Sequence, residues 1–94
     1  MEHSLKPYID EKKSMHLIGI GGVSMSALAE LLLSLGVPVT GSDRAHSAVA
    51  ERLERLGAKI TYAHLPENVE QASVIIRTAA VHDDNPEIMR AHEL

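Results

Sequence analysis

The feature that most constrains this chain is the glycine-rich segment GIGGVSMS, residues 19–26, which separates two different hydrophobic patterns. Before it, residues 15–20 form a short apolar run that is typical of a buried strand. After it, apolar residues recur at helical spacing over residues 24–35, and Gly36 follows where a left-handed C-cap belongs. The pattern therefore predicts a strand, a tight glycine turn and a helix in direct succession.

The rest of the chain alternates in the same way between short apolar runs and amphipathic segments. Further strands are predicted over residues 37–41, 58–62 and 73–78, and further helices over residues 47–56, 66–70 and 86–94. Val49, Leu53 and Leu56 form the expected apolar stripe of the second helix. Asn85 is the expected N-cap of the last helix, with Pro86 in its first position.

Strands that alternate with helices predict an α/β fold, here a Rossmann-like three-layer domain with a small parallel sheet in the order 3-2-1-4. The chain has no Phe, Trp or Cys, so its core must be aliphatic, as suits strands buried on both faces. We expect residues 1–14 to form an N-terminal arm and residues 15–94 to form the domain, excised from a longer protein.

Composition excludes several classes of function. The net charge of −4, the lack of a basic cluster and the two aromatic residues predict no nucleic-acid partner. No apolar run approaches the roughly 20 residues that span a bilayer, and no secretory signal begins the chain, so no membrane partner and a cytoplasmic location are expected. Without cysteine, and with no ligand spacing among the histidines, no metal site is expected; the residues considered are His16, His46, His64, His82 and His92.

The glycine turn has the chemistry of an anion site. The first amides of a helix lack intrahelical partners, and the helix dipole is positive there. Glycine lets the backbone approach phosphate oxygens closely. We expect the turn to hold the diphosphate of a nucleotide, with main-chain donors from Gly22, Val23, Ser24 and Met25 and a hydroxyl donor from Ser24 or Ser26.

Two further observations bear on the ligand. The turn nearly matches the dinucleotide fingerprint G-x-G-x-x-G, and Asp43 follows Gly21 by 22 residues, where an acid would bond a ribose hydroxyl. Ligands of open parallel sheets lie beyond the carboxyl ends of the strands, which adds His64 and Thr78 to the same crevice. Alternatives remain: a turn that serves packing only, Asp43 as the N-cap of the second helix, and His64 as an ordinary loop residue.

The sequence HLIGIGGVSMSALAELLLSLGVPVTGSD, together with GAKITYAHLPENVEQASVIIRTAAVHDDNPEI, resembles the N-terminal domain of the Mur ligases. Within that family the branch that adds L-alanine is the most similar. The family pattern has a glycine turn, a strand that ends G-S-D, and a later D-N-P-E segment. Ser24 and Ala63 stand where the family usually has glycine. The resemblance covers about residues 15–92.

The resemblance implies that this domain binds UDP-N-acetylmuramate for an ATP-dependent amide ligase of peptidoglycan synthesis. The implied contacts to the UDP-sugar are Gly19, Gly21, Gly22, Val23, Ser24, Met25, Ser26, Ser42, Asp43, His64, Thr78 and Ala79. No catalytic residue is expected here, and no cofactor is expected in this domain. ATP and Mg²⁺ would belong to the full-length enzyme, because no G-x-x-x-x-G-K-[ST] loop occurs in the chain.

Three readings stay open on the sequence alone. The first is the UDP-sugar domain of the ligase, joined in the full-length chain to the remaining ligase domains and inactive by itself. The second is an NAD(H)-binding module of an oxidoreductase or sensor, or a murein-peptide-recycling relative. The third is an interaction domain whose turn binds nothing.

Overall fold

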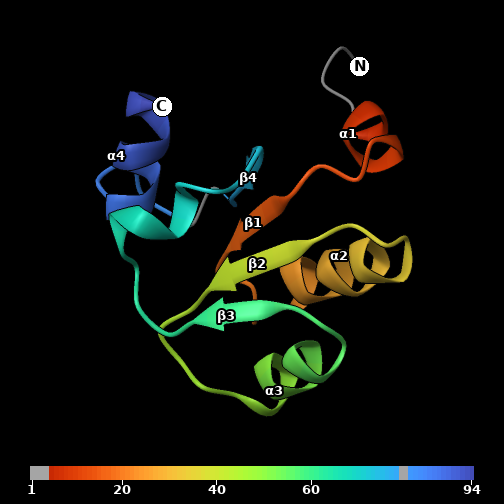
Figure 1. Ribbon diagram of the computed structural model, residues 1–94. Coiled ribbons are helices and arrows are strands. Elements are labelled where there is room, and N and C mark those ends of the chain that lie inside the picture. Colours follow the sequence, from red (N-terminus) through yellow and green to blue (C-terminus); the bar gives the residue numbers. More distant parts are fainter. Residues whose placement is uncertain (1–4, 79–80) are drawn as a thin grey trace.

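Four parallel strands form the centre of the computed structural model, which describes residues 5–78 and 81–94 (Figure 1). The strands are β1 (Met15–Ile18), β2 (Val39–Ser42), β3 (Lys59–Thr61) and β4 (Val74–Ile76). Their order in the sheet is β3-β2-β1-β4, which confirms the predicted fold class and topology. Ile18 pairs with Ser42 and Ser42 with Thr61, so the carboxyl ends of these strands meet at one edge of the sheet.

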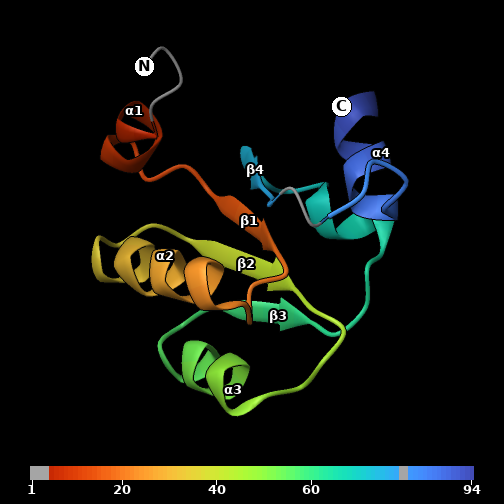
Figure 2. The same cartoon turned by 180° about the vertical axis from the view of Figure 1, so that it is seen from behind.

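Helices lie on both sides of this sheet. The helical elements are α1 (Lys6–Asp10), α2 (Val23–Ser34), α3 (Ala48–Arg55), the 3-10 helix η1 (Pro66–Val69) and α4 (Pro86–Glu93). The two opposite views show α2 and α3 together on one side, whereas η1 and α4 pack against each other near β1 and β4 (Figures 1 and 2). Helix α1 falls within the predicted N-terminal arm.

The strands are shorter than the apolar runs predicted. β1 ends at Ile18 rather than at residue 20, because Gly19 adopts a positive φ of 77° and turns the chain out of the sheet. β2 begins at Val39 because Pro38 has no amide hydrogen for the ladder. Gly36 takes the left-handed conformation expected after α2, and Gly57 also has a positive φ after α3.

The predicted apolar stripe of α3 is wrong in two of its three members. Leu53 is buried, but Val49 and Leu56 are 43% and 49% exposed, and Ala50 is buried in their place. At the start of the helix the side chain of Ser47 accepts a hydrogen bond from the amide of Ala50 and caps α3. This cap also replaces the alternative in which Asp43 caps the helix.

The main core lies between the sheet and α2. Met15 and Leu17 of β1 point to this side, and the apolar residues packed with them come from α2, β2 and α3. Because side chains alternate along a strand, His16 points to the opposite face, where it is fully buried. One face of β1 is thus aliphatic, and the other places a histidine under η1 and α4.

Gly41 is required by the packing between β2 and the glycine turn. A Cβ at this position would lie 2.5–2.9 Å from three side-chain carbons of Ile20, including its Cβ. Ile20 is completely buried. The absence of a side chain at Gly41 therefore lets Ile20 enter the core and fixes the path of the chain at the turn.

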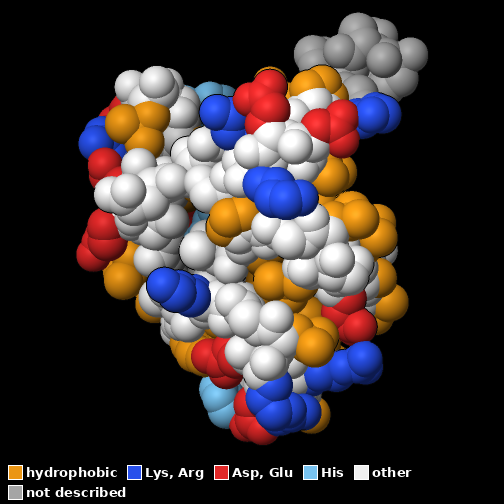
Figure 3. All heavy atoms as spheres, turned by 45° about the vertical axis from the view of Figure 1, so that its right-hand side comes forward, with side chains coloured by type: hydrophobic (Ala, Val, Ile, Leu, Met, Phe, Trp, Pro, Cys, Tyr) orange, Lys and Arg blue, Asp and Glu red, His pale blue; other side chains and the backbone are white. Residues whose placement is uncertain are grey.

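The surface mixes charges of both signs. On the face drawn in Figure 3, acidic and basic side chains are interspersed rather than separated into areas of one sign. Ion pairs at the surface of the molecule include Arg52 with Glu30 and Arg90 with Glu70. Among the helices that the structure describes, none combines the length and apolar character needed to cross a membrane.

Candidate functional site

The glycine turn is held by its own backbone and by the end of β2. The amides of Gly19 and Ile20 both donate to the carbonyl of Ser42, at 2.8 and 3.0 Å. The amide of Gly22, predicted to bind the diphosphate, instead donates to the carbonyl of Gly19 at 3.0 Å. The turn is therefore an ordered structure with its own internal bonds.

Asp43 serves this turn directly. Its Oδ2 accepts a hydrogen bond from the amide of Gly21 at 2.8 Å, and its Oδ1 accepts one from the amide of Arg44, also at 2.8 Å. A Cβ at Gly21 would lie 2.8 Å from Oδ2, so the contact depends on glycine. The carboxylate that was expected to meet the nucleoside thus also fixes the glycine turn to the end of β2.

The N-terminus of α2 opens beside this turn. Gly22 is its N-cap, no side chain caps the helix, and no acidic residue lies in its first turn. Val23 is 90% exposed and Ser24 is also exposed. The hydroxyl of Ser26, predicted as a possible donor to phosphate, donates to the carbonyl of Val23, and the side chain of Met25 is buried. The first amides of α2 and the Ser24 hydroxyl remain as donors for an anion.

A buried polar cluster lies next to the turn, on the face of β1 and β2 that η1 and α4 cover. Its centre is Glu87 of α4, whose Oε1 accepts a hydrogen bond from Ser42 Oγ at 2.7 Å and lies 3.3 Å from His16 Nε2. Asn68 of η1 donates to Glu87 Oε2 and to the carbonyl of Ala63. His64 joins through a 3.2 Å contact between its Nδ1 and Ser42 Oγ. We call these five side chains, Glu87, His16, Ser42, Asn68 and His64, the Glu87 cluster.

The Glu87 cluster favours an ionised carboxylate. Burial by itself raises the pKa of Glu87, but hydrogen bonds from His16, Asn68 and Ser42 outweigh it and lower the pKa below the ordinary range. Glu87, His16 and Ser42 are all at most 1% exposed. A buried negative charge is stable here because each of its oxygens receives hydrogen bonds.

A cavity of about 270 Å³ opens at this edge of the sheet. The residues that line it are Arg44, His64, Val81, His82, Asp84 and Asn85. His64 is therefore shared between the cavity and the Glu87 cluster. Thr78 is exposed, and its carbonyl accepts a hydrogen bond from the amide of Val81, one of the lining residues. Ala79 lies outside the described residues.

The predicted site residues thus fall into connected groups. Gly21 is in direct contact with Asp43, and Ser42 with His64. The carbonyl of Ser42 also accepts from the amide of Gly19 and so connects Ser42 to the glycine turn. Ser42 is completely buried, so its hydroxyl faces the Glu87 cluster. Whether these residues bind the UDP-sugar stays a prediction.

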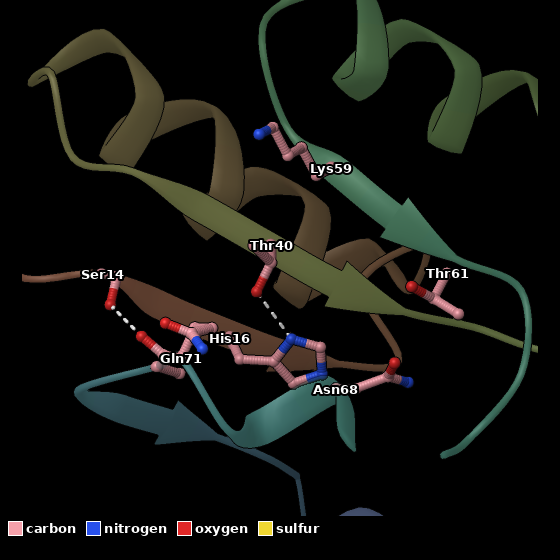
Figure 4. Close-up of a pocket in the computed structure, with 8 residues that line it drawn as sticks. Ser14, His16, Thr40, Lys59, Thr61, Asn68 and Gln71 are labelled. Carbon is pink, nitrogen blue, oxygen red and sulfur yellow. Dashed lines mark hydrogen bonds between the residues drawn. The ribbon is translucent and has the colours of Figure 1, made fainter. Parts of the chain in front are cut away.

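A second cavity, of about 200 Å³, lies on the sheet face behind the cluster (Figure 4). Figure 4 shows His16 on its floor, with Nδ1 directed at Thr40 Oγ1, and Asn68 at one end. The distance between the two His16–Thr40 atoms is 2.7 Å. The Glu87 cluster therefore lies between two hollows, with His16 toward this cavity and His64 toward the crevice.

Several of these residues escaped prediction from the sequence. Glu87, Arg44 and Asn68 were not singled out, and His82 was considered only as a metal ligand. One signal was present: His16 interrupts an apolar run, and a polar side chain inside a buried strand must find a partner. Within residues 5–78 and 81–94, no group of three or more His, Cys, Asp or Glu side chains is arranged to hold a metal ion.

Comparison with known proteins shows the family of the chain. The model of the family described as "Mur ligase family, catalytic domain" matches residues 14–94. The UDP-N-acetylmuramate–L-alanine ligase of Geotalea daltonii is 52% identical over 79 residues, which are 84% of this chain and 17% of that ligase. The chain thus spans about one sixth of the length of this relative.

Two solved structures share the fold. The UDP-N-acetylmuramate–alanine ligase of Thermotoga maritima has a TM-score of 0.81 and 40% identity, over 86% of this chain and 19% of that one. The murein peptide ligase of Psychrobacter arcticus has a TM-score of 0.76 and 29% identity, over 87% of this chain and 18% of that one. Both likenesses extend over most of the present chain.

Proposed function

Since the chain belongs to the Mur ligase family, we propose that it is the domain that binds UDP-N-acetylmuramate for the ligase that adds L-alanine. The observation that carries this proposal is the open N-terminus of α2 beside the crevice. Its amides point out of a turn that Asp43 already holds in place, and no acidic residue lies in the first turn to repel a diphosphate.

The charges around the crevice suit the same ligand. Arg44 and Asp84 both line the cavity at this edge of the sheet, and the guanidinium of Arg44 is a strong partner for phosphate oxygens. We assign the diphosphate to the amides of Val23, Ser24 and Met25, and the uridine to the side of Ser42, Asp43 and His64. Gly19, Gly21, Gly22 and Ser26 shape the turn, and Thr78 and Ala79 complete the pocket.

The chemistry of amide formation would require more than this domain. In our proposal ATP and Mg²⁺ bind to parts of the full-length ligase outside residues 1–94, which also supply the catalytic groups. ATP would activate the lactyl carboxylate of the sugar as an acyl phosphate. L-alanine would then attack this acyl phosphate to form the amide. We therefore propose that the isolated chain binds substrate without turning it over, and that the full-length enzyme works in the cytoplasm.

Family membership weighs against the alternatives. A dinucleotide-binding oxidoreductase is not favoured, because the related sequences are amide ligases. The murein-peptide-recycling branch is less similar, at 29% identity against 40% for the alanine-adding ligase among the two solved structures. These identities support the alanine-adding branch.

Calorimetric titration of the 94-residue chain tests the proposal. We expect saturable binding of UDP-N-acetylmuramate and none of NADH. Binding of NADH but not of the UDP-sugar would favour a dinucleotide domain, and binding of neither would favour a domain whose turn is empty.

A variant of the turn tests the role of its amides. Val23→Pro removes one amide donor at the first helical position, which proline occupies without strain. Gly22 before it is extended, with φ −68° and ψ 160°, as a residue that precedes proline must be. We expect Val23→Pro to weaken binding roughly tenfold or more, since a hydrogen bond to a charged group is lost. Val23→Ala, which keeps the amide, should bind as the parent does.

A further inference from the structure

Glu87 is a buried residue of α4 whose side chain is bonded to other elements of the fold. Its donors come from β1, β2 and η1, through His16, Ser42 and Asn68. It therefore links α4 to the end of the sheet that borders the crevice. Nothing in the binding of a diphosphate by α2 requires this link.

The contacts define where the protons of the cluster lie. An ionised Glu87 only accepts, so Ser42 Oγ–H donates to Oε1, and His16 donates to the same oxygen through Nε2–H. The single proton of Ser42 is then used, so the 3.2 Å contact with His64 requires His64 Nδ1–H to donate to Ser42 Oγ. When the ring of His16 is neutral and its proton is on Nε2, His16 Nδ1 accepts from the hydroxyl of Thr40.

This assignment has a consequence for the crevice. His64 is 15% exposed, lines the cavity and uses Nδ1–H toward the protein interior. The ring nitrogen left for a ligand is Nε2, which in the neutral ring carries a lone pair and no proton. A lone pair accepts from an N–H or O–H group and does not attract phosphate oxygens.

We propose that Glu87 is a positioning residue that, through Ser42, holds His64 in the Nδ1–H form, so that Nε2 accepts a hydrogen bond from a donor group of the nucleoside. The donor classes that fit are the imide N–H of a pyrimidine and the hydroxyls of ribose. The ligand part of this inference rests on the proposed function. It divides the site into amides for the diphosphate and an imidazole acceptor for the nucleoside.

Glu87→Gln tests the assignment because it is nearly isosteric and reverses the direction of the bonds. Asn68 Nδ2 is anchored by the carbonyl of Ala63 at 2.9 Å, so it keeps donating and draws the glutamine oxygen toward itself. The glutamine NH₂ then faces Ser42 and His16. Ser42 accepts from it and turns its own proton to His64, which must change to the Nε2–H form.

The tautomers are read by two-bond nitrogen–proton correlation NMR of the ¹⁵N-labelled chain without ligand. We expect His64 as Nδ1–H in the parent and as Nε2–H in Glu87→Gln. Glu93→Gln is the matched control, since Glu93 lies on the same helix but is 62% exposed and pairs with Arg90. It should leave His64 unchanged. An Nε2–H form in the parent overturns the proposal even if no variant folds, and so does an unchanged tautomer in Glu87→Gln.

Binding provides the second measurement. Glu87→Gln should weaken the affinity for UDP-N-acetylmuramate roughly 3- to 10-fold, the effect of one lost hydrogen bond, and Glu93→Gln should not. Inversion of the tautomer with unchanged affinity overturns the nucleoside contact. A parent chain that does not bind the UDP-sugar refutes the proposed function instead, and the ligand-free NMR result still decides the role of Glu87.

Discussion

The glycine turn and the Glu87 cluster border the same crevice but are built in opposite ways. The turn consists of neighbouring residues, 19–26, and its bonds are almost all made by the backbone. The cluster consists of side chains from four separate elements and the loop after β3, and its centre is completely buried. The glycine turn presents backbone amides to solvent. The Glu87 cluster buries a carboxylate and exposes the edge of the His64 imidazole.

The difference separates two ways of making a binding site specific. Backbone amides bind negatively charged groups, and this binding tolerates changes in the side chains around them. A side-chain cluster is more demanding, because each member depends on the protons of the next and the loss of one leaves the others unsatisfied. Substitutions in the two regions should therefore differ in size and in kind.

The largest effect is expected from Glu87→Ala. The substitution leaves His16, Ser42 and Asn68 buried without their acceptor, which should cost roughly 3–5 kcal/mol of unfolding free energy. Urea unfolding followed by circular dichroism measures the loss. Glu93→Ala is the exposed counterpart on the same helix and should cost less than about 1 kcal/mol. Equal costs would show that the cluster contributes no special stability.

Gly41→Ala should follow, with a loss of about 1–3 kcal/mol from overpacking. The new Cβ would meet the branched carbon of Ile20, which is buried and cannot move aside. Gly21→Ala provides the comparison within the turn, because its Cβ meets the end of the Asp43 side chain, which can rotate away. The same unfolding measurement should give a smaller loss for Gly21→Ala. The packing argument fails if the order is reversed.

Asp43→Ala should act on binding more than on stability. It removes the acceptor for the Gly21 amide and the carboxylate assigned to the uridine side, so the affinity for UDP-N-acetylmuramate should fall by roughly 1–3 kcal/mol. Asp43→Asn keeps an oxygen for Gly21 and should lose less. Calorimetric titration compares the two variants, and an unchanged dissociation constant for Asp43→Ala would refute the role of this carboxylate.

The smallest expected effect is a fall in the free energy of unfolding at acidic pH, which does not show near neutral pH. Because the pKa of Glu87 is lowered on folding, the folded state binds its proton less readily than the unfolded chain. The resulting stabilisation is fully present above the unfolded pKa, near 4.5, and is lost as pH falls through the lower folded pKa. Urea unfolding between pH 6 and pH 3 should show a steeper decline for the parent than for Glu87→Gln. Parallel curves would contradict this assignment.

The contrast between the regions also explains what the sequence predicts. The order of the sheet, the glycine turn and the caps at Gly36 and Asn85 depend on residues close together in the chain. Such features follow from hydrophobic period and local backbone chemistry. The predicted contact region around Ser42, Asp43 and His64 followed from topology, because parallel strands bring their carboxyl ends to one edge.

The Glu87 cluster did not follow, for a physical reason. It joins His16 and Glu87 across 71 positions, and nothing local in the sequence of α4 distinguishes a buried glutamate from a solvated one. The predicted stripe of α3 failed on a smaller scale, since the buried residues of this helix are Ala50 and Leu53 whereas Val49 and Leu56 are exposed. Hydrogen bonds between side chains so far apart in the sequence depend on how the helices and strands pack. The hydrophobic period and the helix and strand propensities of the residues do not determine that packing.

The unequal ends of α2 have a thermodynamic consequence. At its C-terminus the ammonium of Lys12 donates to the carbonyl of Leu35 at 3.0 Å, which neutralises the negative pole of the helix. At its N-terminus no side chain caps the helix. An anion bound there would supply the missing cap, so ligand and folded helix would stabilise each other, and heat resistance would rise with ligand concentration. The uncapped N-terminus of α2 would then lower the stability of the ligand-free domain and contribute to its affinity for an anion.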